Sequence, residues 1–242
     1  MLLIGQYPRR PWKPWEAAID IVLLYAVATL IAMPFYVLTP PPFYYSVFPG
    51  LQSYELPWAQ YIVAWFAFQI ALLWLLASWT TNRGVVREVF KFQFPPQPRL
   101  KVFILILSSF ALIFAVNYFV QFIETGNPDE DFAVFIYLLN SPLAWLAIVM
   151  MVLVAPICEE SLFRGWLLPA LSSSRLGFWG AATTSSFLWS IVHMYSIGAS
   201  VAIFVSGIIL CLLVRHTGTL LVSTTVHALL NGYTAWWFVT QT

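Results

Sequence analysis

Charged residues are scarce in this chain of 242 residues. Lysine, arginine, aspartate and glutamate together make up 9% of the sequence, whereas they form roughly 25% of an average soluble domain. Hydrophobic residues make up 61%, and phenylalanine, tyrosine and tryptophan 18%. This composition excludes an ordinary soluble core and is typical of an integral membrane protein. We therefore expect an all-α fold, a polytopic transmembrane helix bundle surrounded by membrane lipid.

Cysteines and basic tracts are also scarce. The two cysteines, Cys158 and Cys211, both lie in apolar runs. There they are expected to pack as small hydrophobic side chains, not to form a disulfide or a cysteine-based metal site. The net charge is +1, and no basic tract with interleaved aromatic residues lies outside the apolar segments. Nucleic acid is therefore excluded as a partner.

Long apolar runs divide the chain into seven candidate spans. They cover residues 17–38, 57–79, 101–123, 143–171, 178–195, 199–215 and 218–239. At about 20 residues per span, the pattern predicts a bundle of about seven to eight spans that encloses a polar cavity. Residues 1–242 are expected to form a single integral membrane domain.

The basic residues follow the alternation of these spans. With seven spans and a cytoplasmic N-terminus, ten of the eleven Lys and Arg residues fall on the cytoplasmic side. They are Arg9, Arg10, Lys13, Arg83, Arg87, Lys91, Arg99, Lys101, Arg175 and Arg215. The loops on the other side carry only acidic charges, namely Glu55, Glu124, Asp129, Glu130 and Asp131. This asymmetry predicts a multi-pass protein whose N-terminus is cytoplasmic.

The eleventh basic residue lies inside the fourth span, in the stretch APICEESLFRGWLL at 155–168. Ionisable residues in a span are costly and mark functional sites. In a helix, Glu160 and Arg164 are about 40° apart, which favours an ion pair that two parallel hydrogen bonds could clamp. Glu159 lies about 140° from Arg164 and is the freer carboxylate, suited to general-base catalysis. The alternative is an ion pair that only locks helices together.

Two later spans carry histidines. His193 lies near the end of the fifth span, and His227 and Asn231 project from one helical face of the seventh because they are four residues apart. Such groups could bind a water molecule, a metal ion or a developing oxyanion. A structural histidine and a polar seam between spans are the alternatives. Together with Glu159, these residues match the groups needed to activate water and stabilise a tetrahedral intermediate.

The three motifs resemble those of the CPBP family of intramembrane proteases, also called the Abi or CAAX-protease-like family, to which type II CAAX prenyl endopeptidases belong. The family pattern is EExxxR, then an aromatic residue followed by xxxH, then HxxxN. In this sequence it reads Glu159–Arg164, Trp189–His193 and His227–Asn231. Trp189 stands where the family usually has Phe. The resemblance runs from Ala155 to Thr240, within an expected catalytic core at 143–239.

The resemblance implies an intramembrane endopeptidase that hydrolyses a peptide bond in a membrane-associated or C-terminal hydrophobic substrate. This substrate would be a peptide or protein and could carry a lipid. Two other functions stay open: a non-enzymatic membrane immunity or assembly protein on the same scaffold, and a small proton-coupled transporter. The absence of an internal repeat in the sequence disfavours the transporter.

The resemblance also implies roles for six residues. They are Glu159, Glu160, Arg164, His193, His227 and Asn231. Glu159 would activate the attacking water with help from His193, Glu160 and Arg164 would hold the site, and His227 with Asn231 would stabilise the oxyanion. No cofactor is certain, but a divalent metal such as zinc could be bound by a set of four residues. That set is Glu159, His193, His227 and Asn231.

Overall fold

The computed structural model describes residues 14–37, 55–79, 90–123 and 133–241, and every regular element in these ranges is a helix. The predicted all-α fold is therefore confirmed. The elements are α1 (Pro14–Val37), α3 (Glu55–Trp79), α5 (Arg99–Ile123), α7 (Ala133–Leu139), a segmented helix at 144–172, α11 (Gly177–Ile191), α12 (Ile197–Thr217) and α13 (Leu220–Gln241). Each predicted span matches one of these helices, and the short α7 is the helix that the apolar pattern did not predict.

Five helices in the described part of the chain are long and apolar enough to cross a membrane. Their candidate spans are Ala18–Val37, Pro57–Leu75, Arg99–Val120, Ala144–Ser172 and Ile197–Thr217. The other two predicted spans differ for separate reasons. Helix α11 has 15 residues and is therefore about 22 Å long, shorter than a hydrocarbon layer of about 30 Å. Helix α13 has 22 residues but carries a polar stretch in its first half. The chain is a multi-pass membrane protein.

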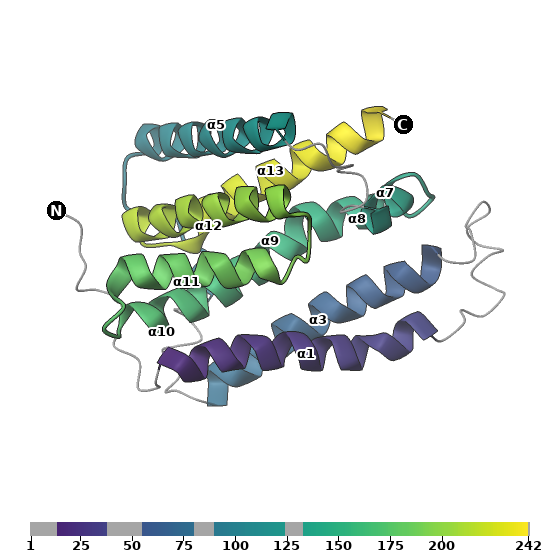
Figure 1. Ribbon diagram of the computed structural model, residues 1–242, viewed down its shortest axis with the longest axis horizontal. Helices are drawn as coiled ribbons and strands as arrows, with labels where there is room; N and C mark the ends of the chain where they lie inside the picture. The colour runs from purple at the N-terminus through teal and green to yellow at the C-terminus, as the bar shows by residue number, and fades with distance from the viewer. Residues whose placement is uncertain (1–13, 38–54, 80–89, 124–132, 242) are drawn as a thin grey trace.

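Successive long helices run in alternating directions through the bundle (Figure 1). Helix α1 packs along α3, whereas α5, α11, α12 and α13 form a second group held by contacts of α12 with the other three. The segmented helix lies between the two groups, since it contacts α1 and α3 as well as α11 and α13. Within its candidate span 61% of the residues are buried, compared with 11% in α5. The helix that carries the glutamates is therefore the centre of the bundle.

The segmented helix changes its hydrogen-bonding pattern along its length. It consists of α8 (Ala144–Val149), η1 (Met150–Val154), α9 (Ala155–Glu159), η2 (Glu160–Leu167) and α10 (Leu168–Ser172), where η1 and η2 are π-helical. A π-helical turn bonds residues five apart, one more than an α-helical turn, and often occurs at functional sites. Pro156 is the second residue of α9 and has no backbone N–H to donate next to η1. The boundary between α9 and η2 falls between Glu159 and Glu160.

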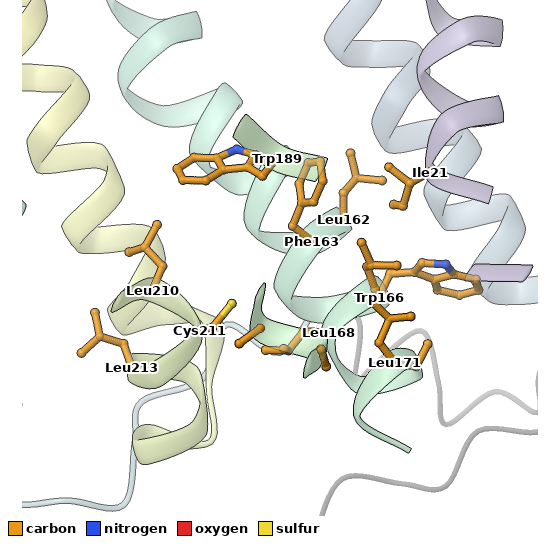
Figure 2. Packing of buried hydrophobic residues seen from close by; sticks show 14 of the residues in the cluster. Ile21, Leu162, Phe163, Trp166, Leu168, Leu171, Trp189, Leu210, Cys211 and Leu213 are labelled. Carbon is orange, nitrogen blue, oxygen red and sulfur yellow. The ribbon is translucent and has the colours of Figure 1, made fainter. Parts of the chain in front are cut away.

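The main hydrophobic core surrounds η2 (Figure 2). Leu162, Phe163 and Trp166 are fully buried in it, against Ile21 of α1 on one side and Leu210 of α12 on the other. This packing removes large apolar side chains from contact with lipid and fixes the rotation of η2 about its axis. Because η2 also carries charged residues, those charges are held deep inside the protein.

The start of α13 is fixed by a contact with a distant loop. Helix α12 ends at Thr217 and is capped by Gly218, whose φ of 70° is a left-handed conformation that glycine adopts without strain. The Thr219 hydroxyl then lies 2.7 Å from the Gln93 carbonyl oxygen, and the Leu220 N–H donates to the Lys91 carbonyl at 2.9 Å. The segment that precedes α5 therefore anchors the turn that sets the position of α13 and of its histidine.

Candidate active site

Glu160 and Arg164 form an ion pair in which both side chains are fully buried. Arg164 Nη1 donates to Glu160 Oε1 at 3.0 Å, and Nη2 donates to the Gly207 carbonyl oxygen in α12 at 3.4 Å. The expected pair of parallel hydrogen bonds is therefore not formed. The guanidinium instead joins two helices, because its second nitrogen is directed at α12 and not at the carboxylate.

The same Glu160 oxygen also holds His227. His227 Nδ1 lies 3.3 Å from Glu160 Oε1, and a carboxylate paired with arginine can only accept, so Nδ1 carries the proton of this hydrogen bond. The other ring nitrogen, Nε2, then faces Glu159 Oε2 at 3.9 Å. This is the arrangement in which a carboxylate fixes the tautomer and the direction of a reactive imidazole.

His193 is oriented in a similar way by a backbone carbonyl. It follows the end of α11, and its Nδ1 lies 2.7 Å from the Trp189 carbonyl oxygen. A carbonyl has no proton to give, so Nδ1 is the donor and Nε2 is the nitrogen left for chemistry. His193 Nε2 lies 3.9 Å from Glu159 Oε2. Both histidines thus direct the same ring nitrogen at the same carboxylate oxygen.

Glu159 occupies the point where these groups converge. It is 8% exposed, and its Oε2 accepts a hydrogen bond of 2.6 Å from Trp189 Nε1–H. The separations of 3.9 Å from the two histidine nitrogens are too long for direct hydrogen bonds. They do allow one water molecule to contact Oε2 and an imidazole nitrogen together. These distances therefore suit a water that bridges a carboxylate and a histidine.

Asn231 lies apart from this cluster. Its Nδ2 donates to the Met151 carbonyl oxygen in η1 at 2.8 Å. Asn231 is one helical turn beyond His227, so the two residues do share a face of α13, as the sequence spacing predicted. The structure thus brings five of the six predicted residues together through direct contacts around Glu159 and Glu160, and connects the sixth to the backbone of the segmented helix.

Trp189 has contacts that the sequence did not indicate. The Arg164 guanidinium carbon lies 4.2 Å from the centroid of its ring, and the rings of His193 and His227 meet it edge to face at 5.4 Å and 5.2 Å. The motif marked Trp189 only as an aromatic position. No spacing rule connects it with a glutamate thirty residues earlier, so this contact was not predictable from local pattern.

Gly207 is a second residue that the sequence analysis missed. A Cβ atom at this position would lie 2.7 Å from Ser186 Cβ and 3.1 Å from Trp189 Cε3. The glycine therefore lets α12 approach α11 closely enough for its carbonyl to receive the Arg164 N–H. A glycine inside an apolar span is typical of close helix packing, and this signal could have identified the position.

The residues that could hold a metal ion do not fit one in this arrangement. The donor types are suitable, because imidazole nitrogens and carboxylate oxygens bind zinc at about 2.0–2.2 Å. Two such ligands on one tetrahedral ion would be about 3.4 Å apart, whereas each histidine nitrogen lies 3.9 Å from Glu159 Oε2. Among the described residues no group of three His, Cys, Asp or Glu side chains is close enough to hold a metal ion. We therefore derive no catalytic step through a metal.

Comparison with known proteins supports a protease. A family model described as "Type II CAAX prenyl endopeptidase Rce1-like" matches residues 141–233. The match agrees with the resemblance that the three motifs indicated, and it covers the segmented helix, α11, α12 and α13 as far as Tyr233. No curated protein and no solved structure matches the chain.

Proposed function

We propose that this protein, matched over residues 141–233 to a family of membrane endopeptidases, hydrolyses a peptide bond within the membrane with Glu159 as the general base. One observation carries the proposal. Three side chains from α11 and α13 and from the segment after α11, namely Trp189, His227 and His193, are all directed at one carboxylate oxygen of Glu159. A carboxylate that only held helices together would not need three convergent partners, and Glu160 already joins the segmented helix to α13 through His227.

The first step in this proposal is activation of water. A water molecule beside Glu159 Oε2 also contacts His193 Nε2, whose lone pair is free because Nδ1 holds the proton. As the water oxygen attacks the substrate carbonyl carbon, its proton moves to Glu159. One C–O bond forms, and the carbonyl oxygen takes the electron pair to become an oxyanion.

The second step is stabilisation of that oxyanion. His227 donates to it from Nε2 in the form in which both ring nitrogens carry protons, and Nε2 is the ring nitrogen that lies 3.9 Å from Glu159 Oε2. Asn231 Nδ2 keeps a second hydrogen after its bond to Met151. We assign this hydrogen to the oxyanion as well.

The tetrahedral intermediate then collapses. The oxyanion re-forms the carbonyl, the C–N bond breaks, and Glu159 returns its proton to the leaving nitrogen. The products are a carboxylic acid and an amine, and Glu159 is again ionised. Glu160 and Arg164 do not exchange protons in this scheme; they keep His227 and the segmented helix in position.

The proposed substrate is a peptide or protein at the membrane, cut near a hydrophobic or C-terminal segment that could be lipidated. The site lies within a bundle that contains helices long and apolar enough to cross a membrane, and the matching family model is described as a CAAX prenyl endopeptidase. We also propose that the N-terminus is cytoplasmic, from the distribution of Lys and Arg. Five of these Lys and Arg residues lie outside the described ranges, namely Arg9, Arg10, Lys13, Arg83 and Arg87, and so do the acidic residues Glu124, Asp129, Glu130 and Asp131.

Glu159→Gln tests the assignment of the base. The purified protein in detergent would be incubated with a synthetic farnesylated CAAX peptide and with the same peptide lacking the farnesyl group, and release of the C-terminal tripeptide would be measured by mass spectrometry. We expect the variant to lose activity about 10²- to 10⁴-fold, the usual contribution of a general base. Asp20→Asn in α1 is the matched carboxylate-to-amide control and should cleave at the wild-type rate. If the Glu159 variant also cleaves at that rate, Glu159 is not the base.

A further inference from the structure

The indole of Trp189 lies between the buried cation and the free carboxylate of the site. Its ring face meets the Arg164 guanidinium at 4.2 Å, and its N–H edge donates to Glu159 Oε2 at 2.6 Å. Trp189 is 4% exposed, so neither contact is shared with solvent to any extent. One side chain thus contacts both charged groups.

The two contacts use opposite ends of the charge distribution of an indole. An aromatic face is electron-rich and attracts a cation, whereas its edge, and above all the N–H, is electron-poor and attracts an anion. A cation over the ring polarises it and makes the N–H a stronger donor, because linked polar contacts reinforce one another in a low-dielectric interior. The hydrogen bond to Glu159 is therefore charge-assisted at its acceptor and strengthened at its donor.

From this geometry we infer that Trp189 is a positioning residue for Glu159, an inference that rests on the proposed function of Glu159 as the base. The terminal torsion of a glutamate side chain is broad, so an unheld carboxylate would turn freely. The Trp189 N–H fixes Oε2 between the two histidine nitrogens. The face of the same ring lies 4.2 Å from the guanidinium carbon of Arg164, which is paired with Glu160.

The close approach of α12 fits this role. Gly207 has no side chain, and an added Cβ would lie 3.1 Å from Trp189 Cε3. The indole therefore packs closely against α12. A phenylalanine at position 189 would keep an aromatic face for Arg164 but would have no N–H to donate to Glu159. The hydrogen bond to Glu159 therefore requires the tryptophan that this chain has at the aromatic position of the motif.

Trp189→Phe isolates the hydrogen bond. With the farnesylated CAAX peptide, we expect kcat to fall roughly 10- to 100-fold, the range found when a partner that orients a reactive group is removed. KM should stay within about twofold, because Trp189 is not proposed to contact the substrate. Trp65→Phe is the matched control: it removes an indole hydrogen bond of 3.2 Å to Thr29 between α1 and α3. It should leave both constants unchanged.

A spectroscopic measurement tests the contact without relying on the activity of the variant. In ¹H–¹⁵N spectra of the detergent-solubilised protein, the indole signal missing from Trp189→Phe identifies Trp189. A short hydrogen bond to a carboxylate shifts this proton downfield. We expect the signal to move upfield in Glu159→Gln, where the acceptor has no charge, and to stay in place in Asp20→Asn.

These results separate the inference from the proposed function. If Glu159→Gln abolishes cleavage but Trp189→Phe keeps the wild-type kcat, or if the Trp189 signal does not move in Glu159→Gln, the role of Trp189 is overturned and that of Glu159 stands. If Glu159→Gln itself keeps full activity, the proposed function fails first. A loss of kcat in Trp189→Phe together with the upfield shift supports both.

Discussion

Glu160→Gln perturbs the clamp at the centre of the bundle. The change removes one negative charge and hardly alters the volume of the side chain. Glu160 and Arg164 are both fully buried and 3.0 Å apart. The guanidinium also contacts the Gly207 carbonyl at 3.4 Å, the face of Trp189 at 4.2 Å and the Cys211 thiol, and none of these groups carries a charge. The variant therefore leaves a buried cation with neutral partners only.

The magnitude follows from these contacts. Removing one partner of a buried ion pair costs about 3–5 kcal/mol. The glutamine carbonyl can still accept one N–H, and the cation–π contact remains, so we expect a loss near the lower value, about 3 kcal/mol. At about 2–4 °C per kcal/mol for a chain of this size, the melting temperature should fall by about 6–12 °C.

The assay is thermal unfolding in detergent micelles, followed by circular dichroism. Glu159→Gln is the matched control, because its hydrogen-bond partner Trp189 is neutral and stays satisfied by an amide oxygen. The double variant Glu160→Gln with Arg164→Met should regain stability, since it removes the unpaired charge as well. The reasoning is refuted if Glu160→Gln melts within about 2 °C of wild type, or if the double variant is less stable than the single one.

Two further predictions concern packing and metal. Gly207→Ala should destabilise the protein by about 1–3 kcal/mol and lower its activity, because the new Cβ would lie 2.7 Å from Ser186 Cβ. Gly232→Ala is the control, because the nearest atom to its new Cβ would be Val152 Cγ1 at 3.7 Å. This control should unfold at or slightly above the wild-type temperature. Cleavage of the CAAX peptide should continue at the wild-type rate after verified metal depletion with a strong chelator, because the histidine and carboxylate atoms are too far apart for one ion. A loss of activity that zinc restores would contradict this.

Local patterns allowed much of the fold to be predicted. The spans follow from composition, because a membrane requires long apolar helices and this chain has few polar interruptions. The Glu160–Arg164 pair follows from a spacing of four residues, which joins side chains in the widened turn of η2 as it does in an α-helix. The apolar runs and the Glu160–Arg164 spacing are both local features of the sequence, so no knowledge of tertiary packing was needed to predict them.

Contacts between distant helices could not be predicted in this way. The Trp189–Glu159 hydrogen bond joins residues thirty apart, and Asn231 reaches Met151 across eighty. Both contacts depend on the axial position and the rotation of each helix relative to its neighbours, and apolar periodicity does not determine either of them. The π-helical turns at η1 and η2 were also not predicted. The helix propensities of these residues do not distinguish α-helical hydrogen bonds, which join residues four apart, from π-helical ones, which join residues five apart.

The short length of α11 has a consequence for how this protein is hydrated. At 15 residues and about 22 Å, α11 ends several ångströms before the far surface of the hydrocarbon layer if the exposed Arg175 keeps its first turn at the near surface. The segment 192–196, which includes His193, is then irregular backbone at membrane depth. Such backbone is tolerated only where protein or water satisfies its polar groups. The N–H groups of Val192, His193 and Met194 are bonded to carbonyl oxygens of α11, and the Met194 side chain is 88% exposed. We therefore expect water to meet the protein at the end of α11, which would bring the reactant of the proposed hydrolysis close to His193.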